Sequence, residues 1–226
     1  MKNIIVVGYK GKMGSVVFNL LQMQGYKVMG KEKGDDFADY DNVWLVIDFG
    51  GDESSVESAR WCRQMGVKLI VGSTGQSEQQ LKEIYDAGKI VPLVFAGNFS
   101  VGVLMMKKMI DLMKNLEIDD VCVFEKHHKN KKDSPSGTAK ELKIELENFI
   151  SKPVQVICER GGEEIGTHSI DFYFGSEVLS VEHRAFSRNV FANGVCLAVE
   201  FLKNTNLAGV FSFADIFDKM SKKKNF

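Results

Sequence analysis

The sequence is poor in cysteine and proline, and it has no long apolar run. Its four cysteines include no C-x-x-C pair, which excludes a zinc ribbon and a disulfide framework and predicts reduced thiols: Cys62, Cys122, Cys158 and Cys196. Only 3 prolines occur in 226 residues, which excludes a Pro-rich linker. No apolar stretch approaches the ~18 residues of a membrane span.

The chain also lacks an excess of charge of either sign. Its 29 basic and 30 acidic residues give a formal net charge of −1. This balance predicts no overall attraction to nucleic acid or to a membrane surface, so a bound anion has to be recognised locally. The apolar run Ile4–Val7 is too short for a signal-peptide core. We therefore expect a cytoplasmic protein with no nucleic-acid partner and no membrane contact.

Short apolar runs alternate with helix-length stretches over the first hundred residues. The runs predict strands at 4–7, 26–30, 43–49, 68–71 and 91–95. The stretches between them predict helices at 15–24, 53–65 and 77–87. Strict alternation is typical of right-handed βαβ units. The sequence thus predicts an α/β fold with a Rossmann-like doubly wound parallel sheet domain.

The pattern changes after Asn98. Helices are expected at 101–116, 136–150, 190–202 and 213–220, and strands at 118–125, 154–158, 167–174 and 178–184. The later strands nearly alternate in polarity, which predicts an α+β domain with a mixed or antiparallel sheet. We expect a first domain over 1–98, a second over 99–186, and C-terminal helices within 187–226 that return to the first. The tail 221–226 is expected to be frayed.

A glycine-rich loop lies between the first predicted strand and its helix. Its residues are Gly8, Tyr9, Lys10, Gly11, Lys12, Met13 and Gly14. Glycine lets the backbone approach a pyrophosphate, whose charge then lies on the amides of the helix N-terminus. The G-x-x-G-x-x-G spacing is a variant of the dinucleotide fingerprint, and a purely conformational turn is the alternative.

An acid at the end of the second predicted strand strengthens the dinucleotide interpretation. Glu32 follows the loop at about the ~20-residue spacing expected of a ribose-binding carboxylate. Its carboxylate suits an unmodified ribose, whereas Lys31 and Lys33 could offset a 2′-phosphate. We therefore expect both NADH and NADPH to bind.

Two further loops follow predicted strands, at the sheet edge where α/β proteins bind ligands. Their residues are Gly72, Ser73, Thr74 and Gly75 in one, and Ala96, Gly97, Asn98, Phe99 and Ser100 in the other. Small and amide side chains there would let a flat ring lie against the backbone. The alternative is two tight βα turns.

The densest polar segment is the basic loop 125–139. His127 and His128 are adjacent, and Lys131 follows them. A histidine and a lysine together can donate a proton as a hydride arrives. A solvated charged face is the alternative. Zinc is a further alternative, but neighbouring residues on a strand point to opposite faces and no familiar ligand spacing is present, so we expect no metal.

The same loop leads into a predicted helix start. Ser134 suits the N-cap and Pro135 the first helical position. The amides of Ser136, Gly137 and Thr138, with two hydroxyls, would then form a cradle for an anion. We expect a small carboxylate substrate there.

At these residues the chain resembles the 4-hydroxy-tetrahydrodipicolinate reductase (dihydrodipicolinate reductase) family. The matching motifs run in family order over nearly the whole chain: Gly8–Gly14, Asp48–Phe49, Gly72–Gly75, Ala96–Val103, Glu125–His128, Lys131, Asp133–Ala139, Arg160–Gly162, Gly166–His168, His183–Ala185, Ser187–Arg188 and Phe191–Gly194. Ser73 stands where the family commonly has threonine, and Gly97 where another small residue or proline is usual. The stretch between Glu32 and Val43 is short.

The resemblance implies an enzyme of lysine and diaminopimelate biosynthesis. Its first domain would bind NAD(P)H through Gly8–Met13, Glu32, Gly72–Thr74 and Ala96–Phe99. The second would bind the substrate and build a homotetramer. Hydride transfer to C4 of the cyclic dicarboxylate, with loss of water, would give tetrahydrodipicolinate. From the two-domain layout, we expect the domains to close for this step.

The resemblance also implies roles for single residues of the basic loop. His127 would be the proton donor or acceptor and Lys131 the proton donor. His128, with Gly137 and Thr138, would hold the substrate's carboxylates.

Three other functions are weighed against this one. Another two-domain Rossmann oxidoreductase, of the amino-acid dehydrogenase type, does not explain the paired histidines that lead into the P-S-G-T turn. A non-catalytic NAD(P)-binding regulator has no use for them. Nucleic-acid binding through Lys126–Lys132 disagrees with the net charge and with the lack of interleaved aromatic residues.

Overall fold

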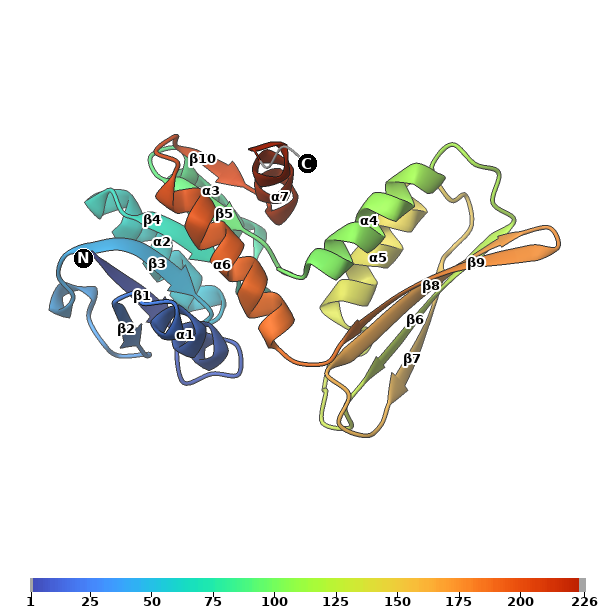
Figure 1. Ribbon diagram of the computed structural model, residues 1–226, viewed down its shortest axis with the longest axis horizontal. Helices are drawn as coiled ribbons and strands as arrows, with labels where there is room; N and C mark the ends of the chain where they lie inside the picture. The colour runs from blue at the N-terminus through green and yellow to red at the C-terminus, as the bar shows by residue number, and fades with distance from the viewer. Residues whose placement is uncertain (1, 224–226) are drawn as a thin grey trace. The chain divides into compact units, whose positions relative to one another are not determined.

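The computed structural model describes residues 2–223, which form two compact units (Figure 1). The first unit spans Met1–Phe99 and Phe191–Phe226, and the second spans Ser100–Val190. The final helix, α7, continues to Lys223, so the tail is helical for its first three residues instead of frayed. The remainder of that predicted tail, 224–226, lies outside the described residues.

Six parallel strands form the sheet of the first unit, in the order β10-β5-β4-β3-β1-β2. Their bounds are β1 (Asn3–Val7), β2 (Val28–Lys31), β3 (Val43–Asp48), β4 (Lys68–Val71), β5 (Pro92–Phe95) and β10 (Gly209–Phe211). The predicted Rossmann-like parallel sheet is confirmed. Its strand order reverses between β1 and β3, and ligands of such sheets bind beyond the carboxyl ends of the strands at this point.

Helices cover both faces of this sheet (Figure 1). They are α1 (Gly14–Met23), α2 (Asp52–Met65), α3 (Glu78–Gly88), α6 (Asn189–Lys203) and α7 (Phe213–Lys223), with a short 3-10 helix, η1 (Phe37–Asp39). Helices α2 and α3 pack on one face, where Ala59 and Ile84 join Val46 and Leu69 in a buried cluster. Helices α1 and α6 lie on the other face. Burial of both faces explains why the strands read as continuous apolar runs.

The second unit is a four-stranded sheet with helices α4 (Val101–Met113) and α5 (Gly137–Glu147) on one face (Figure 1). The strand order is β7-β6-β8-β9, with bounds β6 (Asp120–His127), β7 (Gln155–Arg160), β8 (Gly166–Phe174) and β9 (Glu177–Ala185). Strands β6 and β7 are parallel, and the other pairs are antiparallel. The predicted α+β domain with a mixed sheet is confirmed.

The sequence pattern did not reveal two elements, β10 and η1. Strand β10 has three residues and pairs with β5 at the edge of the sheet. Its β-structure depends on this distant partner, since three residues carry no usable periodicity. Helix α4 ends at Met113, three residues before the predicted end.

Helix α6 is the longest helix described, with 15 residues. Seven of them are buried, which explains its return to the core of the first unit. A bilayer requires ~20 apolar helical residues. In the described part of the chain, no helix combines the length and apolar character needed to cross a membrane.

Gly194 of α6 provides a test of this packing. A Cβ at this position would overlap the carbonyl oxygen of Phe99. Gly194→Ala should therefore destabilise the protein by about 1–3 kcal/mol, although glycine to alanine in a free helix stabilises by about 1 kcal/mol. We expect a Tm lower by roughly 2–4 °C per kcal/mol. Asn193→Ala, at the exposed neighbouring position, is the control, and a higher Tm for Gly194→Ala would contradict the packing.

Candidate functional site

The glycine loop forms a tight turn at the carboxyl end of β1. Gly8 has φ +72, and a Cβ there would lie 2.9 Å from backbone atoms of Phe49 and Gly50. The amide of Gly11 donates to the Gly8 carbonyl at 2.9 Å. A Cβ at Gly14 would overlap that same carbonyl. Because the three predicted glycines have no side chains, the loop, the end of β3 and the start of α1 can lie close together.

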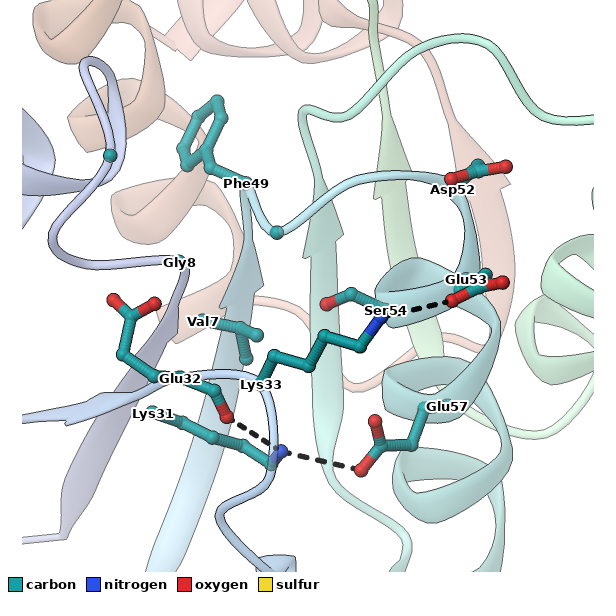
Figure 2. Close-up of a pocket in the computed structure, with 12 residues that line it drawn as sticks. Val7, Gly8, Lys31, Glu32, Lys33, Phe49, Asp52, Glu53, Ser54 and Glu57 are labelled. Atoms are coloured by element: carbon teal, nitrogen blue, oxygen red, sulfur yellow. Dashed lines mark hydrogen bonds and ion pairs between the residues drawn. The ribbon is translucent and has the colours of Figure 1, made fainter.

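Glu32 lies beside this loop, as the spacing predicted. Its Oε1 accepts a hydrogen bond from the Lys10 amide at 2.8 Å. Glu32, Gly8 and Gly11 line a pocket of about 440 Å³ (Figure 2). The structure therefore brings together the glycine loop and the predicted ribose-binding acid, and the missing side chains at the glycines leave a cradle that fits a dinucleotide.

Two lysines line the same pocket, and each is paired with a carboxylate of α2 (Figure 2). Lys31 is buried, and its ammonium lies 3.3 Å from Glu57 Oε1. The ammonium of Lys33, which is exposed, lies 3.6 Å from Glu53 Oε2. The acids of α2 were not among the predicted site residues, because only the fold places α2 at this pocket.

A buried carboxylate organises the loops beyond β3 and β4. Asp48 accepts four hydrogen bonds: from the hydroxyls of Ser58 at 2.6 Å, Ser54 at 2.7 Å and Ser73 at 3.1 Å, and from the amide of Gly50 at 2.9 Å. Burial raises the pKa of Asp48, and these bonds oppose the shift. The carboxylate therefore fixes the loop ends around the pocket.

Two of the predicted cofactor-binding side chains are packed inside the first unit. Ser73 is 7% exposed, and its hydroxyl contacts Asp48 and accepts from the Gly51 amide at 3.0 Å. Phe99 is 3% exposed, and its ring centre lies 5.5 Å from that of Phe213. A cofactor contact at either residue would have to use the backbone.

The strand register of the second unit gathers a polar group at the end of β6. Glu125 and His127 are two positions apart, so they share the face that carries the core residues Val121 and Val123. Strand β8 places His168 opposite Glu125. Strand β7 places Arg160 beside His127. The sequence pattern predicts no role for Glu125, His168 or Arg160, because only the strand register brings these residues together.

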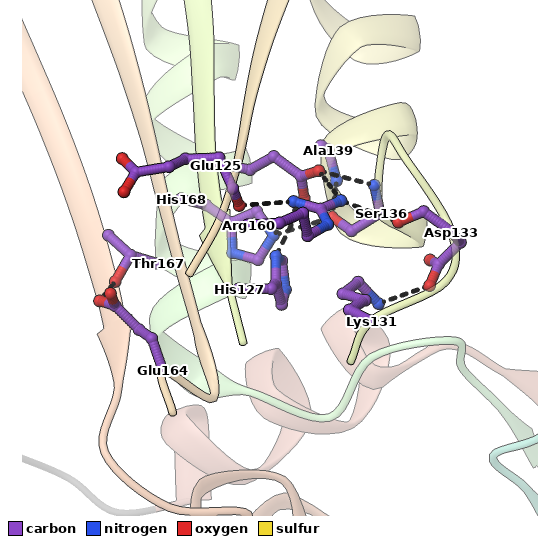
Figure 3. A network of polar contacts seen from close by, with 11 residues as sticks. Glu125, His127, Lys131, Asp133, Ser136, Ala139, Arg160, Glu164, Thr167 and His168 are labelled. Carbon is purple, nitrogen blue, oxygen red and sulfur yellow. Dashed lines mark hydrogen bonds and ion pairs between the residues drawn. The ribbon is translucent and has the colours of Figure 1, made fainter. Parts of the chain in front are cut away.

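Glu125 is the centre of this network (Figure 3). Its Oε1 accepts from Arg160 Nη2 at 2.6 Å and from the Ser136 amide at 3.1 Å. Its Oε2 lies 3.2 Å from His127 Nδ1 and 3.9 Å from His168 Nε2. The carboxylate is thus shared between α5, β7 and two imidazoles.

The network has a consistent charge pattern. Burial raises the pKa of Glu125, but hydrogen bonds from Ser136 and Arg160 outweigh it and hold the pKa at about 2. Burial lowers the pKa of His127, against the attraction of Glu125. Burial also lowers the pKa of His168, to about 4. At neutral pH the site holds an ionised carboxylate next to two neutral imidazoles.

The start of α5 differs from the prediction. The N-cap is Ser136, not Ser134, and Pro135 precedes the helix instead of occupying its first position. The Ser136 hydroxyl accepts from the Ala139 amide at 3.2 Å and contacts His168 Nε2 at 3.1 Å. Ser136 is therefore a structural cap whose amide and hydroxyl have protein partners. The first helical residues are Gly137 and Thr138, at the end where helix amides point toward an anion.

The remaining predicted residues of the basic loop lie at the surface around this network. The Lys131 ammonium lies 2.9 Å from Asp133 Oδ1, and the side chain is 21% exposed. His128 is partly exposed, and its amide donates to the Glu164 carbonyl at 2.8 Å. Gly137 is exposed and Thr138 is partly exposed. The side chains of Lys131, His128 and Thr138 and the backbone of Gly137 can reach a ligand from solvent.

One group of described residues has metal-ligand spacing. One ligand atom from each of Glu125, His127 and His168 lies within 4.8 Å of the others. The guanidinium of Arg160 lies 2.6 Å from the same carboxylate, so it already supplies the positive charge that a cation would bring. The charge at this site does not fit a resident metal ion.

Comparisons of the sequence with known proteins cover both units. The family model described as "Dihydrodipicolinate reductase, N-terminus" matches residues 22–99. The model described as "Dihydrodipicolinate reductase, C-terminus" matches residues 101–217. The 4-hydroxy-tetrahydrodipicolinate reductase of Thermosipho africanus is 31% identical over 93% of this chain and 95% of its own. That of Methanocorpusculum labreanum is 29% identical over 96% of this chain and 99% of its own.

Solved structures give the same fold. A dipicolinate-bound dihydrodipicolinate reductase from Paenisporosarcina sp. TG-14 superposes with a TM-score of 0.75, at 18% identity, over 94% of this chain and 97% of that one. An aspartate dehydrogenase from Thermotoga maritima gives a TM-score of 0.56, at 10% identity, over 90% of this chain and 97% of that one. With sequence matches over both units and this shared fold, the chain belongs to the dihydrodipicolinate reductase family.

Proposed function

We propose that the protein is an NAD(P)H-dependent reductase that acts on 4-hydroxy-tetrahydrodipicolinate in lysine and diaminopimelate biosynthesis. Hydride addition at C4, with loss of water, gives tetrahydrodipicolinate. The observation that carries the proposal is the buried His127 beside the basic loop and the α5 N-terminus, in a chain of this family. Oxidation of NADH or NADPH by the purified protein, on addition of freshly generated substrate, tests it. No oxidation with either cofactor would refute it.

The first unit binds the cofactor in this proposal. Gly8, Tyr9, Lys10, Gly11, Lys12 and Met13 hold the pyrophosphate, and Glu32 holds the adenine-side ribose. The backbone of the loops Gly72–Thr74 and Ala96–Phe99 holds the nicotinamide. When bound, the reduced nicotinamide supplies a hydride. The tight glycine turn and its pocket support this assignment.

The second unit binds the dicarboxylate. The carboxylates are held at the start of α5 by the amides of Gly137 and Thr138, the Thr138 hydroxyl and the His128 side chain. The helix dipole favours negative charge there. Ser136 supports this turn as its cap. His127 and Lys131 move protons, with Lys131 as the donor to the reduced substrate.

The second unit also forms a homotetramer in this proposal. On the sheet face away from α4 and α5, Ile157 and Val178 are 42% and 50% exposed. Apolar side chains on an open sheet face suit an interface between copies of the chain.

The cytoplasm is the proposed compartment, since the four cysteines are free thiols.

The proton-transfer roles predict a loss of turnover. We expect His127→Ala and Lys131→Ala each to lower kcat by about 100-fold or more, in line with the contribution of general acids and bases. Steady-state kinetics at saturating substrate measures this. Lys132→Ala, an exposed position of the same loop, is the control and should keep its kcat. Near-full kcat in both variants would remove these roles.

The carboxylate-binding roles predict a different kinetic signature. His128→Gln and Thr138→Val each remove one proposed contact to the substrate. Each should raise KM for the dicarboxylate roughly tenfold or more, because a hydrogen bond to a charged group is worth about 1.5–3 kcal/mol. Calorimetric titration with pyridine-2,6-dicarboxylate should show the same weakening. Unchanged affinity in both variants would place the substrate elsewhere.

The charges at the adenosine end predict the cofactor preference. Both cofactors bind, and NADH is preferred, because Glu57 and Glu53 already pair with the two lysines that could meet a 2′-phosphate. The variant Glu53→Gln/Glu57→Gln should raise kcat/KM for NADPH relative to NADH by about tenfold, or ~1.4 kcal/mol, because both lysines lose their carboxylate partners. Glu78→Gln, on α3, is the control. If kcat/KM of the native enzyme differs between NADH and NADPH by more than about 1000-fold, or ~4 kcal/mol, the proposal that both cofactors bind is contradicted.

A further inference from the structure

We infer that Glu125 is a positioning residue for His127: its carboxylate holds the imidazole in place and determines which ring nitrogen carries the proton. The inference rests on the proposed role of His127 in proton transfer. It concerns a buried residue that has no role in the proposed chemistry and would not touch the substrate.

The first support is the contact between the two side chains (Figure 3). His127 Nδ1 and Glu125 Oε2 lie 3.2 Å apart. Both atoms are buried, and neither has a hydrogen-bond partner among the described residues. A neutral imidazole carries one N–H, and a carboxylate accepts but does not donate. The carboxylate therefore favours the proton on Nδ1 and leaves the lone pair on Nε2.

The second support is the way Glu125 itself is held. Its Oε1 accepts hydrogen bonds from Arg160 Nη2 at 2.6 Å and from the Ser136 amide at 3.1 Å. Because these groups come from β7 and the start of α5, the carboxylate cannot turn without breaking one of them. Oε2 is left directed at His127. One oxygen fixes the carboxylate, and the other orients the imidazole.

The third support is the close packing of the His127 ring against β8. A Cβ at Gly166 would lie 2.9 Å from Nε2 of the ring. The His168 ring meets it edge-on, with 5.1 Å between ring centres and 75° between planes. Gly166 and His168 thus limit the positions that the imidazole can take. Together with Glu125 they contact the His127 ring from three sides and hold it in the observed orientation.

Several charged groups face His127, and their effects have opposite signs. Burial lowers its pKa most, Glu125 and Asp133 raise it, and Lys131 and Arg160 lower it. His168 faces it as a neutral ring, since its own pKa is about 4. Removing the carboxylate charge at Glu125 should therefore lower the pKa of His127. Removing the guanidinium at Arg160 should raise it.

Glu125 and Arg160 shift the pKa of His127 in opposite directions. A purely structural role of Glu125 would not produce such opposite shifts, so they provide a test. Kinetic pH profiles would be measured for the native enzyme, Glu125→Gln and Arg160→Gln. We expect the apparent pKa of His127 in the pH–rate profile to fall by about one pH unit in Glu125→Gln and to rise in Arg160→Gln. Charges within about 4–6 Å shift a pKa by about this much. Glu159→Gln is the control, since Glu159 is an exposed neighbour on β7 that pairs with Lys126 at 2.5 Å. It should leave the profile unchanged.

A second measurement does not depend on catalysis. Nitrogen-15 NMR of the histidine rings reports the tautomer of His127, which should carry its proton on Nδ1 in the native protein and lose that preference in Glu125→Gln. An unchanged tautomer in Glu125→Gln, with a Tm close to native, would overturn the inference. So would an activity that requires added Zn²⁺ and is abolished by EDTA, because Glu125 would then bind a metal. Near-full kcat in His127→Ala would instead refute the proton-transfer role of His127, and absence of NADH or NADPH oxidation by the native protein would refute the proposed function. The NMR result would stand by itself in either case.

Discussion

The ion pair between Glu125 and Arg160 is the interaction on which the candidate site depends. Glu125 lies on the core side of β6, where an unpaired charge would cost several kcal/mol. Arg160 supplies the opposite charge from the neighbouring strand, at 2.6 Å. The same carboxylate binds the amide that precedes α5. One buried charge therefore joins two strands and a helix start at the place where the basic loop begins.

Most of the fold could be predicted from local patterns. Strand β4 was predicted at its observed bounds, and most other elements within two or three residues, because the sheet of the first unit is buried on both faces and its strands read as apolar runs. Strand β10 could not be found this way. Its three residues form a strand through their pairing with β5, more than a hundred positions earlier in the chain.

The candidate site was predictable only where it is contiguous in sequence. The glycine loop and Glu32 came from a spacing that reflects one βαβ unit, and the structure places them together. The network around His127 depends on the pairing of β6 with β7 and β8, which no short segment contains. Local sequence also misplaced the start of α5, because Ser134 and Ser136 both suit an N-cap. The hydroxyl of Ser136 accepts a hydrogen bond from the Ala139 amide, so Ser136 is the one used.

The first unit is built from two separate segments of the chain, and this has a consequence for biosynthesis. During translation, residues 1–99 leave the ribosome well before 191–226, which supply β10 and two helices. Until then β5 is an open sheet edge, of the kind that pairs with other chains. The nascent N-terminal segment thus exposes an aggregation-prone edge until residues 209–211 have been made and pair with β5.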